Sequence, residues 1–131
     1  GLGFDPEGRL WIQTDGNYTD AGEYEGQGNN QMLVADVRTG ELRRFLVGPS
    51  ACEITGLAFN PDGTAMFVNV QHPGEIGGHP NTPMIDGATV TENQIARQPT
   101  LFSTWPDGAS ASRPRSATFV VRKDDGGVIG T

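Results

Sequence analysis

The chain has 131 residues, of which 19 are glycine and 9 are proline, and its formal net charge is −7. This length suits one compact domain, and the negative charge excludes a basic nucleic-acid-binding surface and favours one that attracts cations. No apolar run approaches the length of a membrane span, so we expect no membrane partner. The chain begins on a glycine inside a strand-like pattern. We therefore expect it to be cut from a longer protein, so a missing targeting segment carries no information.

Short apolar runs between glycine and proline predict an all-β fold, and no helix is expected. The pattern Gly-Leu-small-Phe-Asx-Pro-acid-Gly occurs at Gly1–Gly8 and again at Gly56–Gly63. Each copy precedes an apolar strand, at Leu10–Ile12 and at Met66–Val68. Proline fixes φ in such a turn and glycine accepts a positive φ, so each copy predicts a β-hairpin.

A second kind of hairpin follows each copy. One is predicted from Gln31 to Val47 and the other from Ala117 to Ile129, each with a glycine in its polar turn. Two hairpins in a unit of about 50 residues are typical of a four-stranded β-propeller blade. We therefore predict a β-propeller-like piece of about two four-stranded antiparallel blades.

The first predicted blade covers residues 1–48, and the second covers residues 49–131 with a long inserted loop at 76–114. The link at 17–30 is also enlarged, and enlarged loops on one rim are how propellers build sites. Two blades cannot close a ring. The piece should expose blade faces and strand edges, and we expect it to self-associate.

Acidic and amide side chains gather at the predicted strand ends. Asp15 follows the first hairpin, and Glu53 precedes the strand that leads into the second turn. The ends of an antiparallel pair meet away from its turn, so Glu53 and the Gln71–His72 pair should share one rim. Hard cations bind several oxygen ligands, and Asp15 and Glu53 are the leading candidate metal ligands, with a turn role for Asp15 as the alternative. The other polar residues at strand ends are Asn17, Asn69, Gln71 and Glu75.

Several further residues leave alternatives open. Cys52 is the only cysteine, which excludes an internal disulfide, and we interpret it as a small buried residue, with a metal-ligand or thiol role as the alternative. His72 is compatible with a metal ligand, a proton donor or a structural residue. Asn29 and Asn30 are interpreted as turn residues, and His79 lies in a loop. Five arginines could hold an anion and the sequence selects none of them: Arg43, Arg44, Arg97, Arg113 and Arg115.

Four segments of the chain form a distinctive set, namely Gly8–Gly16, Asn29–Val34, Gly48–Gly56 and Phe67–Glu75. With these segments, most of the chain resembles the C-terminal part of PhoX-type alkaline phosphatases. The phrase Val-Gln-His-Pro-Gly-Glu is specific, whereas the Pro-Asp-Gly hairpin is shared by many propellers. The tail at 105–108 and 113–116 is also similar to the end of that family.

The resemblance implies a six-bladed propeller, export by the twin-arginine route to the periplasm or beyond, and hydrolysis of phosphate esters at a calcium and iron site. Glu53 matches the family's acid before Thr-Gly and Asp15 its acid after the Trp strand, so both are implied metal ligands. The family's catalytic cysteine is not assigned to Cys52. The remaining ligands would lie in N-terminal blades absent here, so the fragment alone should be inactive. A non-catalytic propeller binding module and a calcium-dependent lactonase-type hydrolase remain alternatives.

Overall fold

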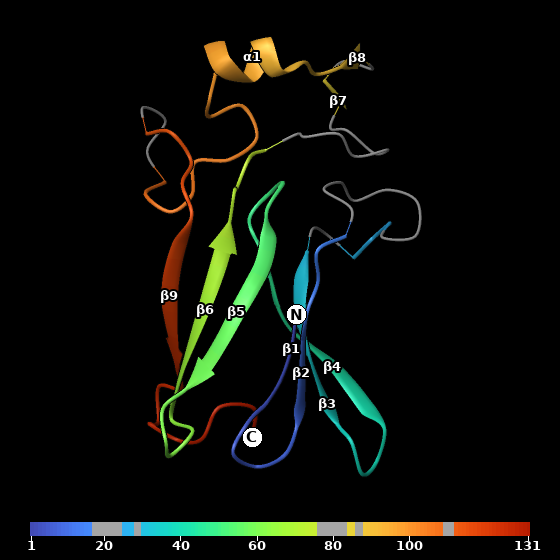
Figure 1. Ribbon diagram of the computed structural model, residues 1–131, viewed down its shortest axis with the longest axis vertical. Helices are drawn as coiled ribbons and strands as arrows, with labels where there is room; N and C mark the ends of the chain where they lie inside the picture. Colours follow the sequence, from blue (N-terminus) through green and yellow to red (C-terminus); the bar gives the residue numbers. More distant parts are fainter. Residues whose placement is uncertain (17–24, 28–29, 76–83, 86–87, 109–111) are drawn as a thin grey trace.

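The computed structural model describes residues 1–16, 25–27, 30–75, 84–85, 88–108 and 112–131 (Figure 1). These residues form two antiparallel sheets, a two-stranded hairpin and a short helix. None of the described helices is long and apolar enough to cross a membrane. The elements are β1 (Leu2–Phe4), β2 (Leu10–Gln13), β3 (Gln31–Asp36), β4 (Glu41–Val47), β5 (Glu53–Phe59), β6 (Ala65–Gln71), β7 (Met84–Ile85), β8 (Ala88–Thr89), α1 (Glu92–Arg97) and β9 (Ala117–Arg122).

The first sheet is a meander in the order β1-β2-β3-β4. Its first turn has the hydrogen bond from Gly8 N–H to the Asp5 carbonyl, 3.0 Å. The second sheet begins with β5 and β6, and its turn repeats that bond from Gly63 N–H to the Asn60 carbonyl, also 3.0 Å. Both glycines have a positive φ. The two copies of the repeated pattern therefore fold into matching hairpins, as the sequence predicts.

The second sheet has the order β5-β6-β9, with three strands where the sequence predicts four. The predicted return strand at residues 128–129 does not pair with β9. Instead Ile129 N–H donates to the Gly63 carbonyl, 2.9 Å, and Arg9 donates to the carbonyls of Ile129 and Gly130, both 2.8 Å. These bonds direct the C-terminal residues towards the two hairpin turns and away from the edge of β9.

Helix α1 corrects the expectation that the chain contains no helix. Thr91 caps its N-terminus through a capping box with Gln94, Glu92 lies in its first turn and Arg97 in its last. None of its residues is buried, so the segment lacks the apolar period by which helices are usually recognised in a sequence. The helix and the β7–β8 hairpin both lie within the predicted loop at 76–114.

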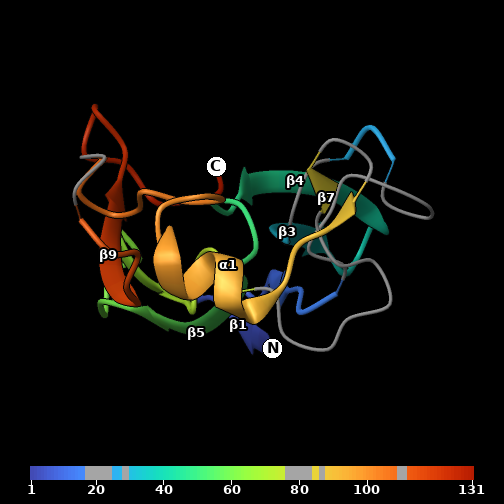
Figure 2. The same cartoon turned by 90° about the horizontal axis from the view of Figure 1, so that it is seen from above.

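The hydrophobic core lies between the two sheets, which occupy opposite sides of the molecule when it is seen from above (Figure 2). Trp11 is fully buried there and meets the ring of Phe45 edge-on at 4.9 Å between centroids. From the second sheet, alternate residues of β6 point into the same core, because successive residues of a strand point to opposite faces. The fully buried residues of the cluster are Trp11, Met32, Cys52, Ile54, Met66, Val68, Val70 and Ile129.

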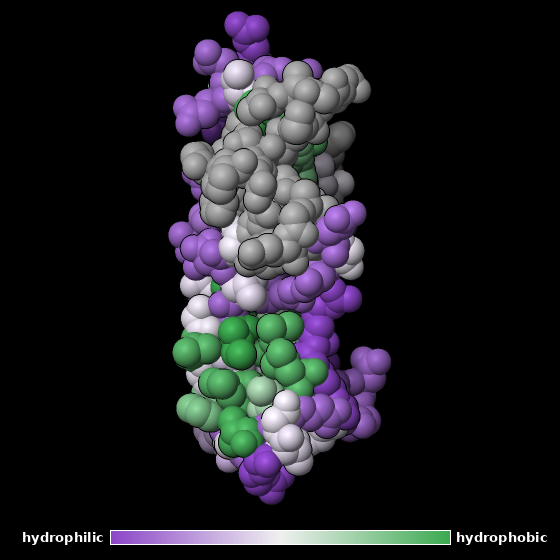
Figure 3. Space-filling view, turned by 90° about the vertical axis from the view of Figure 1, so that its right-hand side faces the viewer, coloured by the Kyte–Doolittle hydropathy of each residue, from purple (hydrophilic) through white to green (hydrophobic). Residues whose placement is uncertain are grey.

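The face of the first sheet that points away from the core is also apolar. Residues directly opposite one another in an antiparallel sheet share a face, and the register aligns Leu2 with Ile12 and Phe4 with Leu10. The side chains of Leu2 and Phe4 are 72% and 65% exposed. Figure 3 shows the apolar side chains gathered on this side of the molecule. We call this surface the outer face, and its apolar residues are Leu2, Phe4, Leu10, Ile12, Leu33, Ala35 and Leu42. Arg44, which pairs with Leu33, lies on the same face at the edge strand β4.

Candidate functional site

Both predicted metal ligands lie at the end of the sheets opposite the two hairpin turns. Glu53 is the first residue of β5 and pairs with Gln71, the last residue of β6, which confirms that they share one rim. Asp15 follows the end of β2. Ile54 N–H donates to the Thr14 carbonyl, 3.3 Å, and this bond joins the two sheets beside both acids. The structure thus brings the backbone at Asp15 and Glu53 together.

Asn30 fixes this junction from inside the protein. Its side chain is fully buried, and its Oδ1 accepts hydrogen bonds from Thr14 Oγ1, 2.8 Å, and from Gly16 N–H, 2.7 Å. Its Nδ2 donates to the Cys52 carbonyl, 2.8 Å. Asp15 lies between Thr14 and Gly16, and Glu53 directly follows Cys52. The Asn30 amide therefore holds the residues on both sides of Asp15 and the residue before Glu53. This role goes beyond that of a turn residue, which is what the sequence predicts for Asn30.

His72 lies between two carboxylates at the same rim. Its Nε2 is 3.6 Å from Glu53 Oε2 and its Nδ1 is 3.2 Å from Glu75 Oε2. Its backbone has φ +39°, which is rare for a residue other than glycine. Ser116 Oγ accepts the His72 N–H, 3.0 Å, and helps to hold this conformation. Strained backbone of this kind is concentrated at functional sites.

The other residues singled out in the sequence have varied positions. Cys52 is fully buried among core side chains, which agrees with its interpretation as a small buried residue. Asn69 lies inside β6, where its Oδ1 accepts a hydrogen bond from Thr118 Oγ1, 2.6 Å. Asn17 and His79 lie outside the described residues, as do parts of the two enlarged links.

The carboxylates of Asp15 and Glu53 could supply only some of the ligands of a metal site. Asp15 is exposed, and the side chain of Glu53 is 21% exposed, so both are accessible to an ion. Within the described ranges, no group of three or more His, Cys, Asp or Glu side chains is placed to hold a metal ion. Carboxylates suit a hard cation, but calcium takes 6–8 oxygen ligands. Two acids therefore fit such an ion only with ligands from elsewhere.

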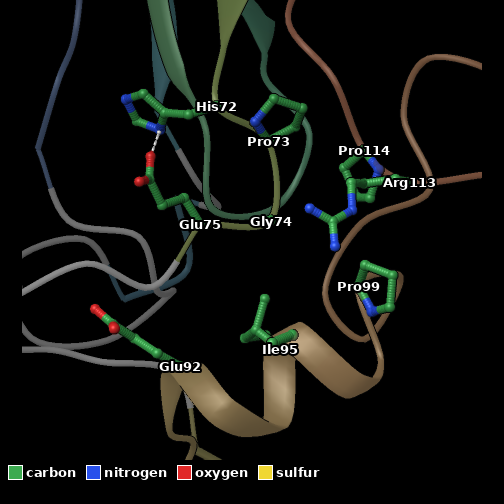
Figure 4. Close-up of a pocket in the computed structure, with 10 residues that line it drawn as sticks. His72, Pro73, Gly74, Glu75, Glu92, Ile95, Pro99, Arg113 and Pro114 are labelled. Atoms are coloured by element: carbon green, nitrogen blue, oxygen red, sulfur yellow. Dashed lines mark ion pairs between the residues drawn. The ribbon is translucent and has the colours of Figure 1, made fainter.

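A pocket opens next to this rim, between the turn after β6 and helix α1 (Figure 4). Its volume is about 430 Å³, within the range of small-molecule sites. Figure 4 shows Glu75 and Glu92 on one side and the guanidinium of Arg113 pointing in from the other. The residues that line it are His72, Pro73, Gly74, Glu75, Glu92, Ile95, Ala96, Pro99, Arg113 and Pro114.

The structure distinguishes among the five arginines that the sequence leaves equal. Arg43 pairs with Glu41 at 2.7 Å, Arg115 pairs with Asp107 at 2.9 Å, and Arg44 donates to the Gln27 carbonyl. Arg97 ends helix α1. Arg113 alone of the five lines this pocket. No signal in the sequence marked it, because the pocket forms only when distant segments come together.

Comparisons with known proteins relate the chain to one family of phosphatases. The family model for alkaline phosphatase PhoX matches residues 1–74, which include Asp15, Asn30, Glu53 and His72. Among solved structures, the chain is similar to PhoX from Pseudomonas fluorescens in complex with vanadate, a transition state analogue. The identity is 45% and the TM-score 0.76, over 99% of this chain and 18% of that one. The comparison with curated proteins finds no match.

Proposed function

Because the chain belongs to the PhoX alkaline phosphatase family, we propose that it is the C-terminal part of an enzyme that hydrolyses phosphate esters. The observation that carries the proposal is the family match over the two hairpins and the rim that holds Asp15 and Glu53. The similarity to PhoX of Pseudomonas fluorescens over 99% of this chain supports it. Since the chain spans only 18% of that relative, the activity is proposed for the complete protein.

In this proposal Asp15 and Glu53 are ligands of a metal centre that contains calcium and iron. Carboxylate oxygens at the junction of two sheets supply the hard donors that calcium prefers, and the remaining ligands come from outside the described residues. Bound cations would neutralise the phosphate oxygens and lower the pKa of a bound nucleophile.

The residues of this chain hold the proposed ligands in place. Asn30 fixes the backbone beside Asp15 and Glu53 through its three side-chain hydrogen bonds. His72 lies against the Glu53 carboxylate and is itself paired with Glu75. Ligands positioned in advance need little rearrangement when an ion binds, which is the usual task of outer-shell partners.

The chain is further proposed to be two blades of a six-bladed propeller in a protein exported to the periplasm or beyond. The matching hairpins and the apolar outer face support this arrangement, because a blade buries both faces only between neighbours. A site completed by other blades leaves the isolated chain without its full ligand set. We therefore expect the 131-residue chain alone to be inactive.

The test is the Glu53→Gln substitution in the full-length protein. Replacing a carboxylate ligand by an amide removes its charge, so bound metal and the rate of phosphate-ester hydrolysis should fall together, the rate by about 10- to 100-fold. The control is Glu41→Gln, because Glu41 is exposed and pairs only with Arg43 among the described residues. It should change neither quantity.

Unchanged metal content and activity in the Glu53→Gln variant would reject the assignment. The metal found in the wild-type protein separates the alternatives. Iron with calcium supports the phosphatase, calcium alone supports a lactonase-type hydrolase, and no metal supports a non-catalytic binding module.

A further inference from the structure

Strand β9 forms one edge of the second sheet, and no described strand lies beyond it (Figure 1). The first sheet has four strands, and the sequence predicts a fourth strand for the second sheet at residues 128–129. Ile129 is bonded instead to Gly63 in the second hairpin turn, and Arg9 holds its carbonyl. The position beside β9 is therefore open among the described residues.

Alternate residues of β9 turn their backbone N–H and C=O groups away from the sheet. The Ala65 carbonyl accepts the Asn60 N–H on the side of β5, so the next residue of β6, Met66, bonds towards β9. Its partner in the register is Val121, and the pattern repeats at every second residue. The outward-facing residues of β9 are therefore Thr118, Val120 and Arg122. No described group accepts a hydrogen bond from their backbone N–H groups.

Strand β9 lacks the features that usually protect a free edge. Natural edge strands are short, charged or bulged, which prevents them from pairing with another strand. Strand β1 has only three residues, β4 carries Glu41, Arg43 and Arg44, and β5 has its bulge at Gly56. By contrast, β9 pairs with β6 in an unbroken register, contains no proline and carries one charge, Arg122, at its last position. Its sequence is that of a strand paired on both sides.

An apolar hollow of about 360 Å³ is lined by β9 together with strands of both sheets. Phe119 lines it from β9, and its ring meets Trp105 edge-on at 6.3 Å between centroids. Leu46 and Val47 line it from β4, and Val47 is 45% exposed. Directly opposite residues of paired strands share a face, so a residue paired with Phe119 on a further strand would lie on the side of this hollow. An apolar side chain there would extend the core.

We propose that an extended strand from the rest of the full-length polypeptide pairs with β9, places an apolar residue beside Phe119 and completes the second sheet. The chain spans 18% of the similar PhoX structure, so a protein of that length has ample further polypeptide. A segment of the same molecule has a high effective concentration at this edge, which favours it over a second copy. The inference rests on the proposed origin of the chain from a longer protein, and not on phosphatase activity.

Hydrogen exchange of the full-length protein, resolved to single residues by mass spectrometry, tests this pairing. The amides of Thr118 and Val120 should exchange within about tenfold of the rate of Phe119, whose N–H is bonded to β6 in either case. Exchange of Thr118 and Val120 more than about 100-fold faster than that of Phe119 would overturn the proposal, because it is the behaviour of a free edge.

The control in the same experiment is Leu42 on the charged edge strand β4. The Asn30 carbonyl accepts the Gly48 N–H on the side of β4, so alternation along β3 turns Val34 towards its partner Arg43. Leu42, next to Arg43, therefore points its N–H away from β3. This amide should exchange at least about 100-fold faster than the amides of β9.

The Val120→Pro variant of the full-length protein separates strand pairing from simple coverage of β9 by a loop. Proline removes an outward N–H and leaves the bonds to β6 in place, so a free edge tolerates it whereas a paired strand does not. We expect exchange at Thr118 to rise at least about tenfold in Val120→Pro and to change less than about twofold in the control Val120→Ala, which keeps the N–H. An equal rate at Thr118 in Val120→Pro and the wild type would overturn the proposal.

The oligomeric state identifies the source of the strand. Slow exchange at Thr118 and Val120 should persist at concentrations where sedimentation velocity shows a monomer. Slow exchange only in a dimer would assign the strand to a second copy and overturn the proposal. Failure of the proposed function has a different signature, because the wild-type protein would then hydrolyse no phosphate ester while the exchange pattern of β9 stays as expected.

Discussion

Asp5 is a nearly buried carboxylate in the first hairpin turn. Burial raises its pKa, but hydrogen bonds from Trp11 Nε1, 2.9 Å, and Arg9 Nε, 2.6 Å, together with backbone donors, outweigh burial and lower the pKa below its usual 3.8. Because Arg9 also holds the C-terminal carbonyls, this one carboxylate links the hairpin turn, the core tryptophan and the chain end.

The lowered pKa of Asp5 predicts a loss of stability in acid. A carboxyl whose pKa is depressed in the folded state stabilises the fold above its unfolded pKa and loses that contribution as pH falls through the folded pKa. Urea unfolding of the chain at pH 7 and pH 3 should show this. Asp5→Asn should cost about 1–3 kcal/mol at pH 7 and reduce the difference between the two pH values. Equal pH dependence in both proteins would contradict the prediction.

Asn30 is the second residue whose side chain determines local structure. Asn30→Asp keeps its shape but replaces the Nδ2 donor with an oxygen that faces the Cys52 carbonyl. We expect a loss of about 1–3 kcal/mol in the free energy of unfolding, measured in urea, because a buried acceptor pair replaces a hydrogen bond.

Asn60→Asp is the matched control. Asn60 Nδ2 donates to Thr64 Oγ1, 3.0 Å, and that hydroxyl in turn donates to Asp62 Oδ1, 2.7 Å. Asn60 lies in a turn and is only half-buried, so water can replace the lost donor. The cost should therefore be smaller than at Asn30. If the two substitutions cost the same, Asn30 has no special role in the junction.

At the scale of the element, β5 contains a bulge between Thr55 and Leu57, at Gly56. Gly56 has φ +59°, and a Cβ there would clash with Asn69 Nδ2 on β6. A side chain would have to displace Asn69, whose Oδ1 accepts the bond from Thr118 of β9. This glycine thus allows the three strands of the second sheet to approach one another.

Gly56→Ala should destabilise the chain more than Gly40→Ala does. Gly40 also has a positive φ, +76°, but a Cβ there meets nothing within 4 Å. The Gly40→Ala variant therefore measures the cost of the backbone conformation alone, about 1–2 kcal/mol. The contact with Asn69 adds to that strain at Gly56, and we expect an extra cost of about 1–3 kcal/mol. Thermal or urea unfolding of the two variants measures the difference, and equal costs would show that Asn69 moves freely.

At the scale of the whole molecule, the outer face of the first sheet governs association. Its four strands expose side chains as large as Leu2, Phe4 and Leu42. A continuous apolar surface of this kind is unusual on a monomer and favours contact with another surface. The same face supports the proposal that a neighbouring blade covers it in the full-length protein.

The isolated chain should therefore self-associate in solution. Phe4→Lys combined with Leu42→Lys places two charges on the outer face and should shift the chain towards monomer in sedimentation velocity. Val120→Lys, which changes an exposed apolar residue of the second sheet, is the control and should leave the association unchanged. A monomeric wild-type chain, or an equal effect of the control, would contradict this prediction.

The sequence by itself determined the local elements whose information lies within a few residues. The Asx-Pro-acid-Gly turns predict both hairpins because proline and glycine restrict the backbone directly. Short apolar runs between glycine and proline predict the strands. The ends of the predicted antiparallel pair place Glu53 beside Gln71, and the register confirms it. The residues of the capping box at Thr91–Gln94 are also present in the sequence. The helix that follows is exposed and has no apolar face, so the sequence shows no apolar repeat that would predict it.

Only the tertiary structure decided how distant segments meet. Asn30 joins the segment after β2 to the residue before β5. Arg9 donates to the carbonyls of residues 129–130, where the sequence predicts a fourth strand, and Arg113 lines one pocket with residues of helix α1. Each of these depends on side chains far apart in the chain, whose approach is set by packing of the two sheets around Trp11. Local propensity does not encode such contacts, because they exist only once the core has formed.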